Sequence, residues 1–175
     1  GEPARAAALL GAIVSDAVSD RLDAAANLGT VAIASKQLEH KDFPLARVRT
    51  PLVVRVSAPD TDVYGAECFG PVSFIVETRD ITESLAVWRS LTTTRGALTA
   101  SVYSTSDSVL EAAESIALDS GVSLSQNLTG DVYVNQTSAF SDFHGTGANP
   151  AANASLTDAA FVASRFRVVE SRRPA

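Results

Sequence analysis

Residues 72–103 read VSFIVETRDITESLAVWRSLTTTRGALTASVY and hold a strand, a helix and a second strand in succession. The Val- and Ile-containing run at residues 72–78 predicts the first strand. Asp80 can cap the helix that follows, and Glu83, three residues later, completes a capping-box-like pair. Residues 98–103 predict the second strand. The expected apolar face of the helix consists of Ile81, Leu85, Trp88 and Leu91.

The same alternation continues toward the C-terminus. Residues 105–108 offer N-caps for a helix that ends at Ser120, with Val109, Leu110, Ala113, Ile116 and Ala117 facing inward. Residues 131–135 predict another strand. Because each helix is long enough for a crossover, the β-α-β-α-β order predicts an α/β fold, a mostly parallel sheet flanked by helices, in one α/β unit.

The flanking segments extend this pattern. An apolar stripe predicts a helix over residues 4–27, and strands are expected at residues 30–34 and 51–56. Residues 35–50, 58–64 and 140–153 are expected to be loops. A short helix at residues 157–165 and a last strand at residues 166–170 end the prediction. The stripe consists of Leu9, Leu10, Ile13, Val14, Ala17 and Val18.

Composition excludes several classes of protein. The net charge is −6, and the basic run 171–173 predicts a solvated tail, so no nucleic-acid partner is expected. A single cysteine, Cys68, predicts a cytoplasmic protein without disulfides. No apolar run approaches the ~20 residues that span a bilayer, so no membrane association is expected. The chain has no Met and begins inside a helix-like segment, which predicts a fragment of a longer protein.

Candidate nucleophiles are weak. Cys68 follows Glu67, and a neighbouring carboxylate disfavours the thiolate, so we interpret Cys68 as a packed thiol. Ser141, Asp142 and His144 resemble a triad in composition, but catalytic triads converge from separate segments, and local turn chemistry explains them better. A small hydrolase is therefore only a remote alternative.

Metal and dinucleotide motifs are equally weak. His40 and His144 are far apart in sequence, which argues against a metal site, and His40 is expected to be a solvated loop residue. Gly145-Thr146-Gly147 matches only the first half of a dinucleotide fingerprint.

The stretch Glu67-Cys68-Phe69-Gly70-Pro71 is more informative. It places a carboxylate and an aromatic ring two residues apart on a Gly-Pro turn before a strand. Such a turn can direct both side chains into a cleft, and a carboxylate that accepts two hydroxyl hydrogen bonds suits a ribose diol. From spacing alone, an ordinary loop carboxylate is the alternative.

The stretch resembles the E-x-F-G-P-[VI] signature of the aldehyde dehydrogenase superfamily. Residues 51–54 resemble the strand before that signature, residues 96–103 resemble its GL-x-A-x-V-[FY] strand, and residues 130–135 resemble its G-x-V-x-V-N strand. The loop at residues 141–153 departs from the common F-G-G-x-K-x-S-G pattern. With residues 157–162 and 165–169 it looks like the PaaN-type branch, which is linked to bacterial phenylacetic acid degradation.

The resemblance implies roles for two segments of the chain and for individual residues. Residues 1–164 would form the C-terminal part of the catalytic domain, and residues 165–175 a C-terminal oligomerisation strand and tail that makes a homo-oligomer. Glu67 would bind the nicotinamide ribose of NAD or NADP, and Phe69 would lie near the nicotinamide. Phe143 and His144 would lie near the tunnel for an aldehyde substrate, a ring-opened semialdehyde or its CoA thioester.

The resemblance also implies what this stretch does not carry. In the family a Cys thiolate attacks the aldehyde, hydride passes to NAD(P)+, and a Glu activates water. Both residues and the dinucleotide-binding domain would precede this chain, so the chain alone is expected to be inactive. The alternative is a free-standing, non-catalytic α/β assembly or ligand-binding module with the same fold.

Overall fold

The computed structural model describes residues 10–97, 99–129, 169 and 171–174. The chain divides into two compact units, Gly1–Thr78 and Arg79–Ala175. The expectation of one α/β unit is therefore replaced by two, and each is described separately.

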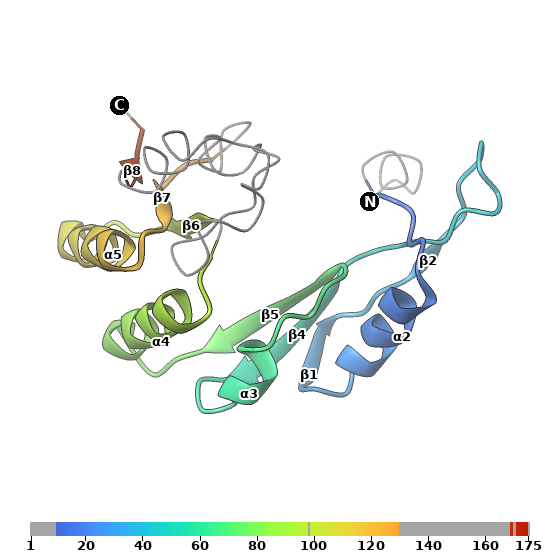
Figure 1. Cartoon of the computed structure of the whole chain (residues 1–175), viewed down its shortest axis with the longest axis horizontal. Helices are drawn as coiled ribbons and strands as arrows, with labels where there is room; N and C mark the ends of the chain where they lie inside the picture. The colour runs from blue at the N-terminus through green and yellow to red at the C-terminus, as the bar shows by residue number, and fades with distance from the viewer. Residues whose placement is uncertain (1–9, 98, 130–168, 170, 175) are drawn as a thin grey trace, which may run out of the picture. The chain divides into compact units, whose positions relative to one another are not determined.

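The first unit is built on a sheet of β1 (Thr30–Ile33), β4 (Leu52–Ser57) and β5 (Val72–Glu77), in the order β1-β4-β5 among the described residues (Figure 1). Strand β1 runs antiparallel to β4, and β5 runs parallel to it in an unbroken register from the Leu52–Val72 pair onward. All three strands were predicted within one or two residues, and the parallel pair agrees with the predicted fold class.

Helix α2 (Asp16–Ala25) contributes to the core of this unit. Its Leu22 and Ala25 are buried in one cluster with apolar side chains of β4. A short helix, α3 (Thr61–Tyr64), lies in the segment that was expected to be a loop. The buried members of the cluster are Ile13, Leu22, Ala25, Leu52, Val54 and Val56.

The predicted start of the first helix was wrong in the described part of the chain. Helix α2 begins at Asp16, after Ser15 as N-cap, and residues 10–15 are not helical. The backbone N–H of Ile13 donates to the carbonyl of Arg47 at 2.7 Å, a contact far along the chain. Ile13 is buried nonetheless, so the apolar stripe indicated a core residue but not its conformation. Residues 1–9 lie outside the described part.

Residues 35–50 contain a hairpin where a loop was expected. Strands β2 (Gln37–Leu38) and β3 (Val48–Arg49) pair antiparallel. Two ion pairs join this side of the unit to α2: Arg47 with Asp16, and Arg49 with Asp23 at 2.6 Å. Such short strands are specified by tertiary contacts rather than by a local period.

The second unit contains α4 (Ile81–Thr94), β6 (Thr99–Val102), α5 (Asp107–Ser120), β7 (Ser123–Gln126) and β8 (Ser171–Arg172). Its sheet has the order β6-β7-β8 among the described residues, and both pairings are parallel. Ala113 and Ala117 of α5 pack with Leu124 of β7 in a second core cluster, against which the side chain of Trp88 packs.

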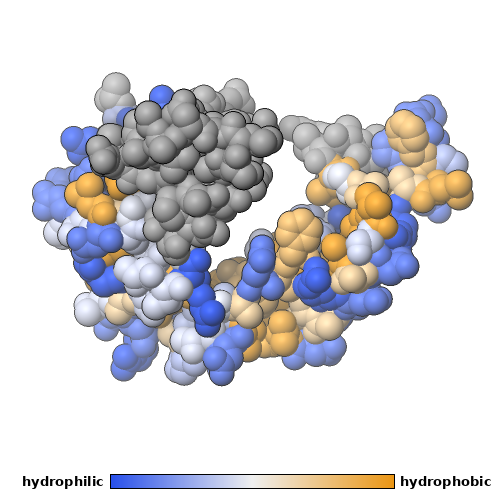
Figure 2. Space-filling model, in the orientation of Figure 1, coloured by the Kyte–Doolittle hydropathy of each residue, from blue (hydrophilic) through white to orange (hydrophobic). Residues whose placement is uncertain are grey.

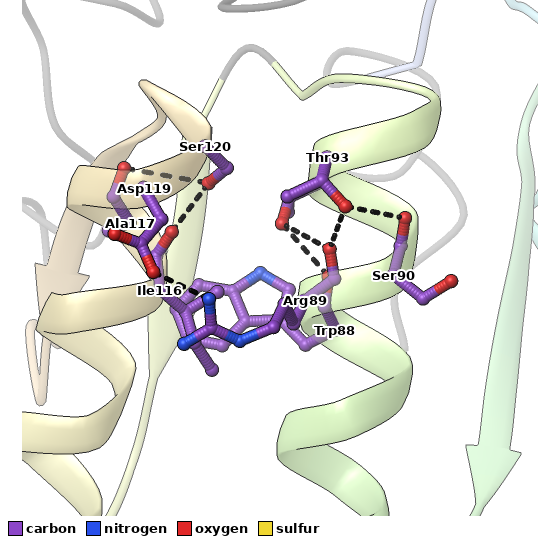
Figure 3. Close-up of polar contacts among 9 residues, drawn as sticks. Trp88, Arg89, Ser90, Thr93, Ile116, Ala117, Asp119 and Ser120 are labelled. Atoms are coloured by element: carbon purple, nitrogen blue, oxygen red, sulfur yellow. Dashed lines mark hydrogen bonds and ion pairs between the residues drawn. The ribbon is translucent and has the colours of Figure 1, made fainter.

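Helices α4 and α5 lie side by side, as the close-up in Figure 3 shows. The guanidinium of Arg89 donates to the carboxylate of Asp119 at 2.5 Å across the two helices. Within the helices, the hydroxyls of Thr93 and Ser120 donate hydrogen bonds to the carbonyls of Arg89 and Ile116, both at 2.7 Å.

Several predictions for this unit need correction. Strand β5 belongs to the β1-β4-β5 sheet of the first unit, and β6 belongs to the β6-β7-β8 sheet of the second, so among the described strands α4 links two different sheets. Ile81 is 48% exposed rather than part of the buried face of α4. Strand β7 was not predicted, and the strand expected at residues 131–135 lies outside the described residues. The Ser171–Arg172 pair forms β8 beside β7, so it is more than a solvated tail.

Candidate functional site

The Gly-Pro turn singled out in the sequence connects α3 to β5 in the first unit. Gly70 has φ +148°, a backbone conformation that side chains with a Cβ rarely adopt. A Cβ at this position would also lie 3.2 Å from Cγ1 of Val18 on α2. The glycine is therefore required both by the backbone angle and by the close approach of α2.

Hydrogen bonds hold this turn on both sides. The guanidinium of Arg21 on α2 donates to the carbonyl of Phe69 at 2.6 Å. The backbone N–H of Leu52 on β4 donates to the carbonyl of Pro71 at 2.8 Å. Just upstream, the hydroxyl of Tyr64 donates to the carbonyl of Ala58 at 2.5 Å. The backbone of the turn is thus fixed to α2 and to the sheet.

Glu67 and Phe69 project from this fixed backbone toward solvent. Phe69 is 68% exposed, and Glu67 is exposed as well. Among the described residues, none gives the Glu67 carboxylate a hydrogen bond or an ion pair. An exposed aromatic ring and an unpaired carboxylate contribute little to the stability of the fold, so this pair is available to bind a ligand.

Cys68, between them, points the other way. It is partly buried and packs against the core cluster of the first unit. This placement agrees with the interpretation of Cys68 as a packed thiol. The described surroundings give it no cationic partner that would stabilise a thiolate.

Arg21 is the residue that sequence reasoning missed. It is 48 positions from Phe69 in sequence and lies on a helix that was predicted only from its apolar stripe. No motif marks it, because its role depends on the packing of α2 beside the turn.

Phe143 and His144, the expected substrate-tunnel residues, lie outside the described residues. So do Ser141, Asp142 and the Gly145–Gly147 motif. Of the predicted site residues, the described part of the chain contains Glu67 and Phe69, and their roles in cofactor binding stay predictions.

A concavity of about 610 Å³ lies beside the loop between β2 and β3, away from this turn in sequence. Figure 2 shows apolar surface at this loop. His40 is half-buried there, and its ring lies 5.0 Å from that of Phe43, so it is less solvated than expected. The residues that line this concavity are mostly apolar and lack converging charges. They are Leu10, Ala12, His40, Asp42, Phe43, Pro44, Leu45, Ala46 and Val48.

Two other kinds of site are absent from the described part of the chain. No group of three His, Cys, Asp or Glu side chains there is arranged to hold a metal ion. No helix there combines the length and the apolar character needed to cross a bilayer.

Comparison with known proteins decides the family. Residues 1–147 match the model of the aldehyde dehydrogenase family. The chain belongs to that family. The resemblance that was drawn from the Glu67–Val72 stretch is therefore confirmed at the level of the family.

A solved relative agrees with this aldehyde dehydrogenase assignment. The chain is similar to the crystal structure of an NAD-dependent aldehyde dehydrogenase from Burkholderia multivorans, with 54% sequence identity and a TM-score of 0.76. The match covers 89% of this chain and 28% of the relative's chain. The comparison with curated proteins found no match.

Proposed function

We propose that this chain supplies the cofactor-facing turn of an NAD(P)-dependent aldehyde dehydrogenase and does not supply its nucleophile. The observation that supports this proposal is the turn itself. Glu67, which is unpaired among the described residues, and Phe69, which is exposed, project from a backbone that Arg21 and β4 hold in place. Family membership gives this turn its chemical context.

The residues present fit the proposed cofactor. Within the described part of the chain, the Glu67 carboxylate has both oxygens free to accept hydrogen bonds, which is what the two hydroxyls of a ribose require. The exposed face of Phe69 offers an apolar surface for the nicotinamide end. When bound, NAD(P)+ supplies the hydride acceptor of aldehyde oxidation.

The contribution of the chain's own residues is positioning. Hydride transfer depends on the orientation of the reacting groups, so a ribose anchor on a fixed backbone limits the motion of the ring attached to it. Arg21 keeps the Phe69 carbonyl, and with it the turn, against α2. Glu67 would hold the ribose, and Phe69 would exclude water from one side of the bound group.

The second part of the proposal concerns the nucleophile. Cys68 is the only cysteine of the chain, and it packs inward against the core. The thiol of the reaction would therefore come from a part of the subunit that this chain does not contain. The solved relative is consistent with this, because most of its length has no counterpart here.

The substrate follows only from the resemblance of the loop at residues 141–153 to the PaaN-type branch. We propose that the substrate is a ring-opened semialdehyde or its CoA thioester, in phenylacetic acid degradation. This loop, with Phe143 and His144, lies outside the described residues. We propose NAD or NADP as the cofactor, and the solved relative is an NAD-dependent enzyme.

The experiment compares this chain with a chimera. In the chimera, residues 1–175 replace the matched part of the Burkholderia multivorans enzyme. The isolated chain mixed with NAD+ or NADP+ and a panel of aldehydes should produce no NAD(P)H, and the chimera should produce it. The Cys68→Ala variant of the chimera should keep its activity. Turnover by the isolated chain that is lost in Cys68→Ala would refute the proposal and favour a self-contained enzyme.

The alternative, a free-standing non-catalytic module, makes a different prediction. In that case the chimera would fold and remain inactive with every aldehyde, while the unmodified Burkholderia multivorans enzyme remains active.

A further inference from the structure

We infer that Tyr64 is a positioning residue for Glu67, because the hydrogen bond from its hydroxyl to the carbonyl of Ala58 fixes the upstream end of the segment that carries the Glu67 carboxylate. This inference rests on the proposed function for the role of Glu67 in cofactor binding. It deepens that proposal by naming the contact that sets where the carboxylate lies.

The segment from Ala66 to Cys68 has no anchor of its own. Among the hydrogen bonds of the described residues, none involves a backbone group of Ala66, Glu67 or Cys68. Helix α3 ends before this segment, and its C-cap Gly65 donates its backbone N–H to the carbonyl of Thr61 at 2.8 Å. The position of Glu67 therefore depends on the residues that flank the segment.

Contacts hold the chain on both sides of this segment. Downstream, Cys68 packs against the core cluster of the first unit, and the carbonyl of Phe69 accepts the hydrogen bond from Arg21. Upstream, Tyr64 packs against the same core cluster. Glu67 lies between these two inward-packed side chains and is itself exposed, so its neighbours on each side present it to solvent.

The hydroxyl of Tyr64 connects the upstream anchor to the sheet. It donates to the carbonyl of Ala58 at 2.5 Å, and the N–H of Ala58 donates to the carbonyl of Glu77, the last residue of β5, at 3.2 Å. Ala58 is buried and directly follows β4. The phenol thus ties the chain just before Glu67 to the end of both parallel strands.

The short distance in sequence makes this tie effective. Only Gly65 and Ala66 separate Tyr64 from Glu67. Glycine has the greatest backbone freedom of all residues, and Ala66 is exposed, so rotation at these two positions would move the carboxylate once the tie is lost. A displacement of about 1 Å in a positioning group can lower a rate on the order of 100-fold, so the loss of this hydrogen bond should be visible in the kinetics.

Backbone order parameters from NMR relaxation test the structural part of the inference on the isolated chain. Tyr64→Phe removes the hydroxyl and keeps the ring. The order parameters, which report motion on the picosecond-to-nanosecond timescale, should fall at Ala66 and Glu67 in this variant. They should stay unchanged at Val54, in the centre of β4, which shows that the sheet is intact.

A double-mutant cycle in the chimera tests whether Tyr64 acts through Glu67. With the Glu67 carboxylate present, Tyr64→Phe should reduce kcat/KM for NAD(P)+ on the order of 10-fold. In the Glu67→Ala background, the same substitution should change kcat/KM by less than about 2-fold, because no carboxylate is left to position. A merely structural role of Tyr64 would give the same loss in both backgrounds.

Tyr103→Phe is the matched control. It also removes a hydroxyl hydrogen bond, which runs at 2.7 Å to the carbonyl of Leu128 in the second unit. This variant should leave both the order parameters of Ala66 and Glu67 and the kinetics of the chimera at their wild-type values. Equal effects of Tyr103→Phe and Tyr64→Phe would contradict a specific role for Tyr64.

Two further results would overturn the inference. Unchanged order parameters at Ala66 and Glu67 in Tyr64→Phe would show that the hydroxyl does not restrain this segment. Equal losses of kcat/KM with and without the Glu67 carboxylate would show that Tyr64 acts on the fold as a whole.

Failure of the proposed function gives a different result. An inactive chimera, or an active one whose kcat/KM for the cofactor is unaffected by Glu67→Ala, would contradict the cofactor role of Glu67. The order parameters of the isolated chain would still decide whether Tyr64 positions that residue.

Discussion

At the scale of single residues, Gly70 determines whether the turn can form. Its φ is +148°, and a Cβ added to it would lie 3.2 Å from Cγ1 of Val18, so any side chain there is strained. We expect Gly70→Ala to lower the free energy of unfolding by about 1–3 kcal/mol. Chemical denaturation measures this cost. Gly11→Ala is the matched control, because a Cβ at Gly11 has no atom within 4 Å, and equal effects of both substitutions would contradict the strain argument.

Arg21 is expected to act on the turn rather than on the fold as a whole. Arg21→Met keeps much of the aliphatic stem and removes the hydrogen bond to the Phe69 carbonyl, which should cost about 1 kcal/mol of unfolding free energy. In the chimera, the same change should raise the KM for the cofactor more than it lowers kcat.

The control for this prediction is Arg21→Lys, which keeps a cationic donor and should restore part of the cofactor affinity. Arg55→Met removes an exposed ion pair with Glu77 on the same unit and should leave the kinetics unchanged. An Arg21→Met chimera with wild-type cofactor KM would show that Arg21 has no positioning role.

At the scale of elements, the hydrogen bonds at the N-terminus of α4 make a pH-dependent contribution to the free energy of unfolding. The Asp80 carboxylate accepts from the N–H of Glu83 at 2.8 Å, as predicted for an N-cap. The Glu83 carboxylate accepts a hydrogen bond from the backbone N–H of Arg79 at 2.6 Å. In a standard capping box the donor would be the N–H of the N-cap residue, Asp80, so the donor here lies one residue before it. The hydrogen bond from the Arg79 side chain to this carboxylate lowers the pKa of Glu83 and raises the pKa of Arg79.

The sign of the pH effect follows from the lowered pKa of Glu83. The group stabilises the folded state above the usual glutamate pKa, about 4.3, and this contribution is lost as the pH falls through the lower folded-state pKa. Melting temperatures of the wild type and of Glu83→Gln should therefore differ at neutral pH and converge in acid. A difference that grows as the pH falls would contradict this assignment.

The elements also show what sequence could and could not predict. Strands β4 and β5 and the cap of α4 depend on nearby residues, and they were found. The extended segment before α2 depends on the contact between Ile13 and Arg47, and the sequence pattern there favoured a helix. Strand β7 was missed because the polar run Ser123–Gln126 is buried by its neighbours rather than marked by apolar residues.

The candidate site, too, could be predicted only where its residues are close together in sequence. Glu67 and Phe69 are close in sequence and belong to a family signature, so they could be predicted. Arg21 is brought to them only by tertiary packing, and no local signal identifies it.

At the scale of the whole molecule, residues 165–175 are the segment expected to form the contacts of a homo-oligomer. We propose that this segment contributes to self-association, as the resemblance implies. Deletion of residues 164–175 should lower the oligomeric state in sedimentation velocity. Because β8 pairs with β7 and the Gln126 amide donates to the Ser171 hydroxyl at 2.7 Å, the deletion should also destabilise the second unit.

The two effects of this deletion can be separated. The Ser171→Ala variant removes the hydrogen bond from Gln126 and keeps the strand, so it should lower stability slightly without changing the oligomer. An unchanged oligomer after the deletion would contradict the proposed role of the C-terminal strand.

The central claim is that Glu67 binds the cofactor and does not stabilise the fold. The exposed carboxylate, unpaired among the described residues, should tolerate Glu67→Gln without loss of stability. In the chimera, the loss of charge-assisted hydrogen bonds, each worth about 1.5–3 kcal/mol, should reduce kcat/KM for the cofactor on the order of 10- to 100-fold. Glu39→Gln, at an exposed loop carboxylate, is the control.

The most direct measurement is therefore kcat/KM for NAD(P)+ in the wild-type, Glu67→Gln and Glu39→Gln chimeras, with melting temperatures recorded on the same samples. The account predicts a large loss in Glu67→Gln alone, at an unchanged melting temperature. A lowered melting temperature with unchanged kinetics in Glu67→Gln would show that Glu67 is structural and would contradict the account.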